Sequence, residues 1–140
     1  MAANPPALAH LEPDACLALL RLEEVGRLAI SVGGHPDIFP INYAIDDETI
    51  VFCTAEGTKL AASFISPSIA FEADGYDTAT GDAWSVVVKG HAEEIEMHDL
   101  VDETAFPLYP WSSWPKSRFV RVVPQEISGR RFHVAQRRPS

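Results

Sequence analysis

Short runs in which apolar and polar residues alternate, each closed by turn-forming residues, constrain the fold of this chain more than any other feature. Residues 27–32 alternate in this way, and Gly33-Gly34 turns the chain into a second run at 38–45. The acidic triplet 46–48 makes another tight turn into a third run at 49–54. A period of two residues is typical of half-buried strands, and glycine and aspartate favour tight turns. These residues therefore predict three antiparallel strands in succession.

Further strand patterns follow in the second half of the chain. Residues 68–73 and 83–95 form two of them, and Gly90 inside the longer one is expected to allow a bend or a bulge. Residues 119–123 and 127–134 predict a last strand or pair of strands. Six or seven short strands joined by tight turns predict a mainly β fold, a small closed or partly open antiparallel barrel with a few helices.

Helical patterns are fewer. Pro13 suits a first helical turn, and Gly26 is the predicted end of the first helix. Residues 60–65 and 98–106 predict two further short helices. The apolar stripe of the first helix consists of Cys16, Leu17, Leu19, Leu20 and Val25.

Pro40 lies inside the second predicted strand. Proline cannot donate a hydrogen bond to a neighbouring strand, and it is confined to edges, strand starts and bulges. Pro40 therefore indicates a place where the sheet opens. The neighbouring Asn42 has two interpretations, a polar side chain free to face a ligand or one that forms a structural hydrogen bond into the hairpin.

Size and charge limit the function. The 140 residues make one domain at 12–134, between a disordered leader at 1–11 and a basic tail at 135–140. The net charge of −9 argues against a nucleic-acid partner, because such binding depends on cations that neutralise phosphates. Residues 116–140 are nevertheless basic, which favours a segment that folds onto the acidic body or helps to bind an anionic ligand over one that contacts RNA.

Several sequence patterns that would indicate secretion, membrane insertion or metal binding are missing. It has no signal peptide pattern and no apolar run of membrane-spanning length, so a cytoplasmic location and no membrane partner are expected. Cys16 and Cys53 are expected to be reduced, buried thiols. The five histidines lack metal-binding spacing, and no nucleophile with a matching base is apparent, so neither a metal site nor a catalytic side chain is predicted.

The segment Thr54-Ala-Glu-Gly-Thr-Lys59 is the strongest functional pattern. It follows a predicted strand and precedes a predicted short helix, so the amides of Gly57, Thr58 and Lys59 would face one anion. Lys59 is one of only four Lys or Arg residues before residue 116. The pattern is short, and a solvated loop with an ordinary surface lysine explains it as well. The residues alone therefore leave a phosphate site and a plain loop open.

Several motifs in order resemble the pyridoxamine 5′-phosphate oxidase-like superfamily of flavin-binding split β-barrels. The resemblance covers roughly residues 12–134, and it favours the phosphate interpretation of Lys59. The motifs that carry it are residues 24–30, 37–43, 51–59, 71–74 and 84–90.

The resemblance implies a homodimer that holds FMN, or alternatively the deazaflavin coenzyme F-420, in grooves between the subunits. It implies phosphate contacts at the end of the third strand, by Thr54, Gly57, Thr58 and Lys59. It also implies that one strand passes beside the isoalloxazine ring, with Phe39, Pro40, Ile41 and Asn42, and that a fifth-strand segment approaches the ring or ribityl chain, with Trp84, Ser85 and Val86. A C-terminal segment with Trp111 and Arg118 would close the pocket.

Two departures from the family pattern argue against vitamin B6 oxidation. Leu60 stands where a second basic residue usually follows the phosphate lysine, and residues 129–134 stand where an arginine motif binds the substrate. The sequence therefore predicts a short, divergent member, an FMN-dependent oxidoreductase for a small planar or hydrophobic substrate. The alternatives are an F-420-dependent reductase, a non-catalytic module that stores or senses flavin, and a structural dimer with a vestigial pocket.

Overall fold

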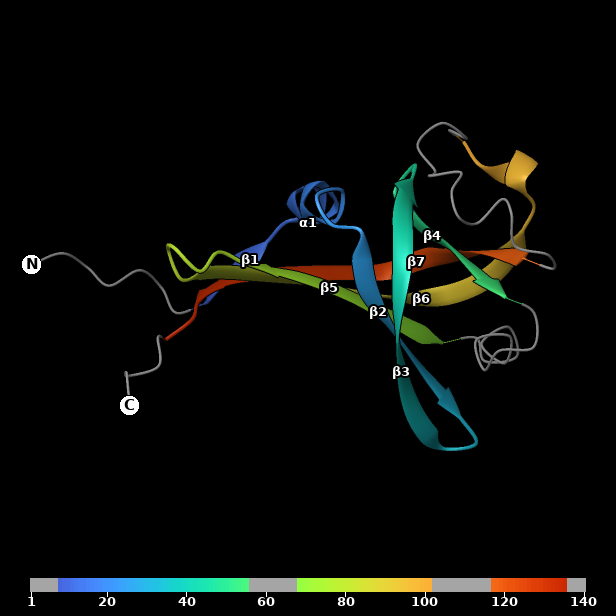
Figure 1. Cartoon of the computed structure of the whole chain (residues 1–140), viewed down its shortest axis with the longest axis horizontal. Helices are drawn as coiled ribbons and strands as arrows, with labels where there is room; N and C mark the ends of the chain where they lie inside the picture. The colour runs from blue at the N-terminus through green and yellow to red at the C-terminus, as the bar shows by residue number, and fades with distance from the viewer. Residues whose placement is uncertain (1–7, 56–67, 102–116, 136–140) are drawn as a thin grey trace, which may run out of the picture.

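A computed structural model describes residues 8–55, 68–101 and 117–135 of the chain. In these residues, seven antiparallel strands accompany one α-helix and one short 3₁₀ helix (Figure 1). The elements are β1 (Leu8–Leu11), α1 (Pro13–Leu20), β2 (Val25–Val32), β3 (His35–Asp46), β4 (Thr49–Ala55), β5 (Ile69–Tyr76), β6 (Asp82–Ile95), η2 (Met97–Asp99) and β7 (Ser117–His133).

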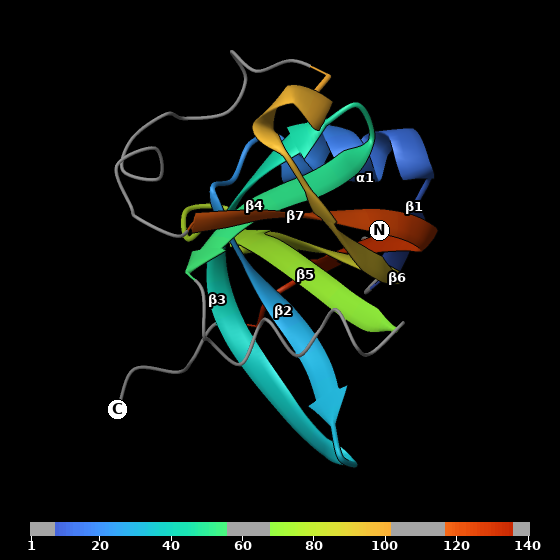
Figure 2. The ribbon, with the colours of Figure 1, turned by 90° about the vertical axis from the view of Figure 1, so that its right-hand side faces the viewer.

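The strands form a barrel of the split type. The sheet order is β1-β7-β4-β3-β2-β5-β6, and an additional pairing of β6 with β7 closes the ring. β1 lies outside that ring, on the last residues of β7. The far end of the β2–β3 hairpin projects from the barrel in both views (Figures 1 and 2). The predicted mainly β barrel of six or seven strands is confirmed.

The core lies inside the barrel and under α1. Phe52, Phe71 and Leu28 are fully buried there, as is Leu20 at the end of α1. Tyr43 meets the ring of Phe71 edge-on, with 4.8 Å between ring centroids, and its hydroxyl donates a hydrogen bond to the carbonyl of Leu20. The helix is thereby held against one end of the barrel.

The turns and the bulge follow the sequence closely. Gly33 and Gly34, with φ of 59° and 80°, make the β2–β3 turn, and positive φ angles at Asp47 and Glu48 make the β3–β4 turn. The register of β6 against β7 shifts between Lys89 and Gly90, which confirms the expected bulge. The last strand pattern is one continuous strand, β7, and not a pair.

Three predictions near the N-terminus and at residues 98–106 differ from the structure. Residues 8–11 belong to β1 and not to a disordered leader, because they find a partner in β7. The first helix ends at Leu20, and Gly26 lies within β2. A Cβ atom at Gly26 would lie 2.5 Å from the ring of Phe71, so this glycine permits close packing across the barrel and does not terminate a helix. In place of a helix from residue 98, a 3₁₀ turn spans Met97–Asp99, and residues 102–106 lie outside the described part.

Candidate functional site

The sheet opens between β3 and β4, beside several of the predicted cofactor residues. Pairing of these strands runs from the turn only as far as Tyr43 opposite Phe52. Beyond that point residues 39–42 pair with β2 alone, and residues 53–55 pair with β7. Pro40 lies in the half of β3 that β4 does not cover, as its missing N–H group predicts. The two borders of the opening are thus the segments in which the sequence places cofactor contacts.

The side chains of residues 39–42 differ in what they can offer a ligand. Pro40 is exposed, Phe39 packs partly against the core, and Ile41 is buried. Asn42 donates a hydrogen bond of 2.7 Å from Nδ2 to the carbonyl of Glu24. The bond confirms the interpretation of Asn42 as a residue with a structural hydrogen bond. The side-chain carbonyl of Asn42 remains available as an acceptor.

The second border ends in the predicted phosphate segment. In the β4–β7 ladder the backbone of Thr54 lies opposite that of Arg118, so two predicted site residues are neighbours. β4 ends at Ala55. Gly57, Thr58, Lys59 and Trp111 lie outside the described residues. The register therefore brings the start of the phosphate motif beside the start of the last strand.

The predicted fifth-strand segment lies elsewhere, at the beginning of β6. Trp84 and Val86 are buried in the core cluster, where the indole of Trp84 lies against Gly75 and would contact a Cβ atom there. Ser85 points the other way, and its Oγ accepts a hydrogen bond of 3.3 Å from Nε of Arg130. Among these three side chains, Ser85 is the one that lines a surface hollow.

The predicted residues thus fall into two groups. Thr54 is opposite Arg118, whereas Ser85 is opposite Arg130, twelve residues further along β7. β7 crosses much of the molecule between these points (Figure 1). Among the described residues, one chain therefore presents the predicted contacts at two separate places along this strand.

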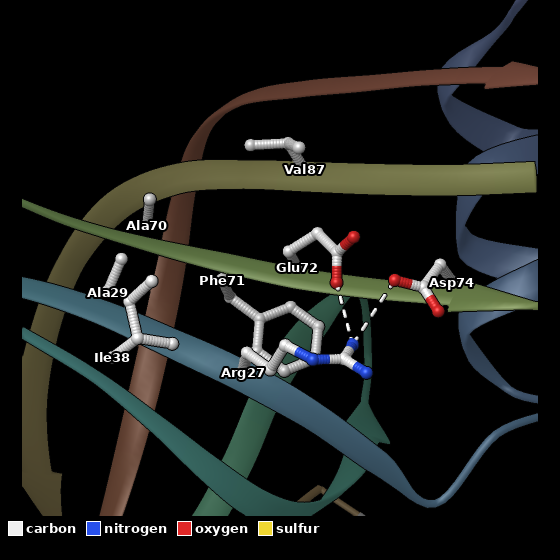
Figure 3. Close-up of a pocket in the computed structure, with 8 residues that line it drawn as sticks. All are labelled: Arg27, Ala29, Ile38, Ala70, Phe71, Glu72, Asp74 and Val87. Carbon is white, nitrogen blue, oxygen red and sulfur yellow. Dashed lines mark hydrogen bonds and ion pairs between the residues drawn. The ribbon is translucent and has the colours of Figure 1, made fainter.

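The sequence reasoning missed a charged cluster on the outer face of β2 and β5. Arg27 Nη1 lies 2.9 Å from Glu72 Oε1 and 3.2 Å from Asp74 Oδ2, at the edge of a hollow of about 420 Å³ (Figure 3). Burial and the neighbouring Asp74 raise the pKa of Glu72 to about 7, although Arg27 acts in the opposite direction. The two-residue spacing of Glu72 and Asp74 was the available signal, since it puts both carboxylates on one face of a strand.

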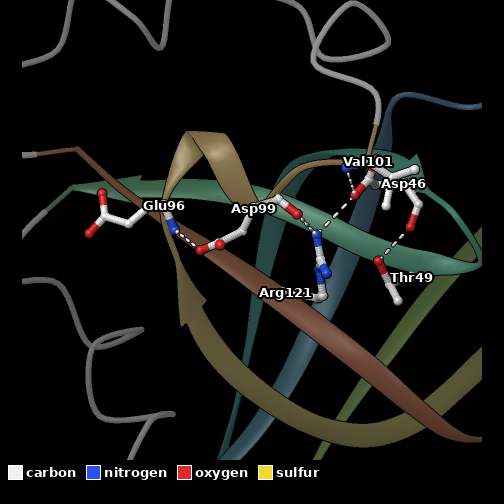
Figure 4. A network of polar contacts seen from close by, with 6 residues as sticks. All are labelled: Asp46, Thr49, Glu96, Asp99, Val101 and Arg121. Carbon is white, nitrogen blue, oxygen red and sulfur yellow. Dashed lines mark hydrogen bonds and ion pairs between the residues drawn. The ribbon is translucent and has the colours of Figure 1, made fainter.

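A second missed feature is a buried ion pair near the β3–β4 turn. Asp46 Oδ2 accepts hydrogen bonds of 2.9 Å from Arg121 Nη2 and from the backbone N–H of Val101 (Figure 4). Arg121 Nη2 also donates to the carbonyl of Asp99, at 3.0 Å. The network joins the β3–β4 turn and β7 to the residues that precede segment 102–116. Asp46 had been interpreted only as part of a turn.

Fold and register define a split-barrel protein with an opening between β3 and β4. The family model described as pyridoxamine 5′-phosphate oxidase matches residues 12–131. The chain belongs to this family. Within the described residues no helix is long and apolar enough to cross a membrane.

Two relatives of known structure share both sequence and fold with this chain, and a third is similar in sequence. The FAD binding protein of Mycobacterium smegmatis is 38% identical, and the match covers 89% of this chain and 100% of that chain with a TM-score of 0.77. A FAD-binding protein of Mesorhizobium loti is 27% identical, covering 89% and 96% with a TM-score of 0.75. An uncharacterised protein of Mycobacterium tuberculosis is 40% identical over 89 residues, which are 63% of this chain and 79% of the relative.

Proposed function

We propose that this protein is a flavin-binding oxidoreductase for a small planar or hydrophobic substrate, with the cofactor held between two copies of the chain. The observation that carries the proposal is the sheet opening, whose two borders contain residues 39–42 and Thr54. The family match over residues 12–131 supports a cofactor there. The flavin supplies the hydride chemistry itself, and the protein binds and orients it.

The form of the flavin is the next part of the proposal. The sequence favours FMN, with F-420 as the alternative, because the predicted phosphate turn at Gly57–Lys59 is compact. The relatives from M. smegmatis and M. loti are both described as FAD-binding proteins. FAD therefore joins FMN and F-420 as a candidate, and the three are to be compared directly.

The separation of the two groups of predicted residues supports the proposal of a homodimer. Thr54 and Arg118 lie together, whereas Ser85 lies beside Arg130. A second copy related by a twofold axis can bring its Ser85 segment to the first copy's opening, and the same contact then recurs on the other side. Each cofactor would be held by residues of both copies.

Within such a site the described residues have definite tasks. The bond from Asn42 to Glu24 fixes the orientation of this amide, whose carbonyl can accept a hydrogen bond from a ligand N–H group. Pro40 presents an exposed ring without a competing N–H group. Fixed groups of this kind orient a planar ring at little cost in conformational entropy.

The variant Lys59→Ala tests the proposal, with Arg21→Ala as a matched control that removes one exposed cation from the end of α1. We expect Lys59→Ala to bind FMN and FAD at least about tenfold more weakly, since a charge-assisted phosphate contact contributes about 1.5–3 kcal/mol. Fluorescence titration gives the affinities, and circular dichroism verifies folding. Wild-type affinity in Lys59→Ala would contradict the phosphate assignment.

A second measurement separates an enzyme from a flavin store. The bound flavin is mixed anaerobically with NADH, NADPH or reduced F-420, and its absorbance is followed. Reduction at a rate that depends on donor concentration supports the oxidoreductase. A bound flavin that no donor reduces would instead favour the storage or sensing module.

A further inference from the structure

A hollow of about 440 Å³ lies on the outer face where β1, β7 and β6 run side by side. Three of its lining residues form one row across these strands, because His10 lies opposite Arg130, and Arg130 lies opposite Ser85. Lys89 and Ser128 line the same hollow further along β6 and β7. Two cations, two hydroxyls and an imidazole thus converge from three strands.

The charges of this hollow are unusual for the protein. The chain carries −9 overall, yet no carboxylate lines this hollow within the part of the chain that the structure describes. Glu126 lies opposite Lys89 across the ladder, and both residues line the neighbouring hollow. Within residues 8–55, 68–101 and 117–135, neither Lys89 nor Arg130 has a carboxylate at ion-pair distance. As far as the described residues are concerned, these two cations are therefore available to a ligand.

The hydrogen bonds are also arranged for an anion. Ser85 Oγ accepts from Nε of Arg130, so its O–H group remains free to donate. The guanidinium carbon of Arg130 lies 5.7 Å from the centre of the Phe132 ring, which supports the group from one side. The terminal nitrogens of Arg130 retain the planar pair of donors that suits oxyanions.

We propose that the hollow formed by His10, Ser85, Lys89, Ser128 and Arg130 binds a phosphoryl group of a small-molecule ligand. Lys89 and Arg130 neutralise its charge, and the two serine hydroxyls donate hydrogen bonds to its oxygens. This inference extends the proposed function. The identity of the ligand rests on that function, whereas the phosphoryl site itself does not. The phosphoryl group belongs either to the second phosphate of a flavin dinucleotide or to a separate phosphorylated ligand.

Inorganic phosphate is the first probe, followed by amide chemical shifts in ¹⁵N-labelled protein at constant ionic strength. We expect saturable shifts at Ser85, Lys89 and Arg130. In Lys89→Gln/Arg130→Gln the affinity at these amides should fall at least about tenfold, since two charge-assisted contacts are lost. The control Arg21→Gln/Arg131→Gln removes the same two charges from exposed positions outside the hollow. Shifts that do not saturate, or that weaken equally in both double variants, would overturn the site.

A second arm identifies the source of the phosphoryl group. If it belongs to a flavin dinucleotide, Lys89→Gln/Arg130→Gln weakens FAD binding at least about tenfold more than it weakens FMN binding. If this double variant binds both flavins with unchanged affinity but has lost the phosphate shifts, the phosphoryl group belongs to a separate phosphorylated ligand. Lys59→Ala separates the two proposals, because failure of the flavin site leaves the phosphate shifts at Ser85, Lys89 and Arg130 intact.

Discussion

Glu72 is a carboxyl group whose charge state depends strongly on its surroundings. It lies between Asp74, which repels its negative charge, and Arg27, which attracts it. Burial outweighs the arginine and raises the pKa of Glu72 to about 7 from its ordinary value of 4.5. This carboxyl group is therefore one that exchanges a proton near neutral pH.

Glu72→Gln should make stability less dependent on pH. The folded protein holds the Glu72 proton up to a pH near 7, whereas the unfolded chain releases it near 4.5. The native state then binds more protons in this window, so the free energy of unfolding falls as pH rises from 4.5 to about 7. Glutamine cannot ionise and removes this loss. Urea unfolding from pH 5 to 8 measures the slopes, and equal slopes for wild type, Glu72→Gln and the control Glu126→Gln would refute the shift.

Asp46 contributes to stability through a buried ion pair with Arg121. Its side chain is 3% exposed and that of its partner Arg121 is 16% exposed. Removal of one partner leaves the other charge buried and poorly compensated, which is more damaging than replacement of both by apolar groups.

Asp46→Ala should lower the free energy of unfolding by about 3 kcal/mol. Arg121 Nε already has no hydrogen-bond partner within the described residues, so the loss of Asp46 leaves this side chain with little compensation. The double variant Asp46→Leu/Arg121→Met should recover part of that stability. Urea unfolding gives all three values. A double variant that is less stable than Asp46→Ala would show that the pair is not the reason for the loss.

At the scale of elements, α1 depends on close contact with the ladder beneath it. Gly129 of β7 faces Cys16 of α1, and a Cβ atom added to Gly129 would lie 2.5 Å from Cys16 Sγ. The same Cβ atom would lie 3.3 Å from Val86 Cγ2. The glycine therefore sets how near the helix can approach the sheet.

Gly129→Ala should destabilise the protein by about 1–3 kcal/mol through overpacking. Cys16→Ala removes the sulfur atom that the new methyl group would contact. The double variant Cys16→Ala/Gly129→Ala should then be more stable than the sum of the single changes predicts. A double-mutant cycle by urea unfolding measures this coupling, and strict additivity would contradict the contact.

The elements predicted well from sequence are those whose causes are local. Glycines at positive φ specify the β2–β3 turn, and the missing N–H group of Pro40 indicates the opening in the sheet. β1 and Gly26 were misjudged because their roles depend on distant partners, β7 and Phe71. The Arg27–Glu72 pair likewise joins residues 45 positions apart. Single-sequence patterns do not contain such pairings.

The candidate site shows the same division. The family resemblance implies a phosphate contact for Thr54, but it does not say that Arg118 is its neighbour or that Val86 is core. The cations Arg130 and Lys89 come together with Ser85 only through the register of β1, β7 and β6. Strand register depends on the whole barrel, so these juxtapositions required the structure.

In the proposed dimer, each flavin site combines residues from two copies of the chain. In the proposed site, Lys59 would act with the group at the opening and Ser85 with the group at the start of β6, so a variant of either should lose flavin binding. In a mixed dimer, one site combines the intact Lys59 of one copy with the intact Ser85 of the other. The second site of that dimer carries both changes.

Lys59→Ala and Ser85→Gln should therefore complement each other. When the two are unfolded together and refolded, half of the dimers are mixed and each has one intact site, so flavin binding should return to about one quarter of the wild-type capacity. Fluorescence titration measures the capacity, and each variant refolded alone is the control. Analytical ultracentrifugation verifies that all samples are dimers. A mixture that binds no more flavin than the separate variants would place both residues in one copy's site, and the shared groove would have to be abandoned.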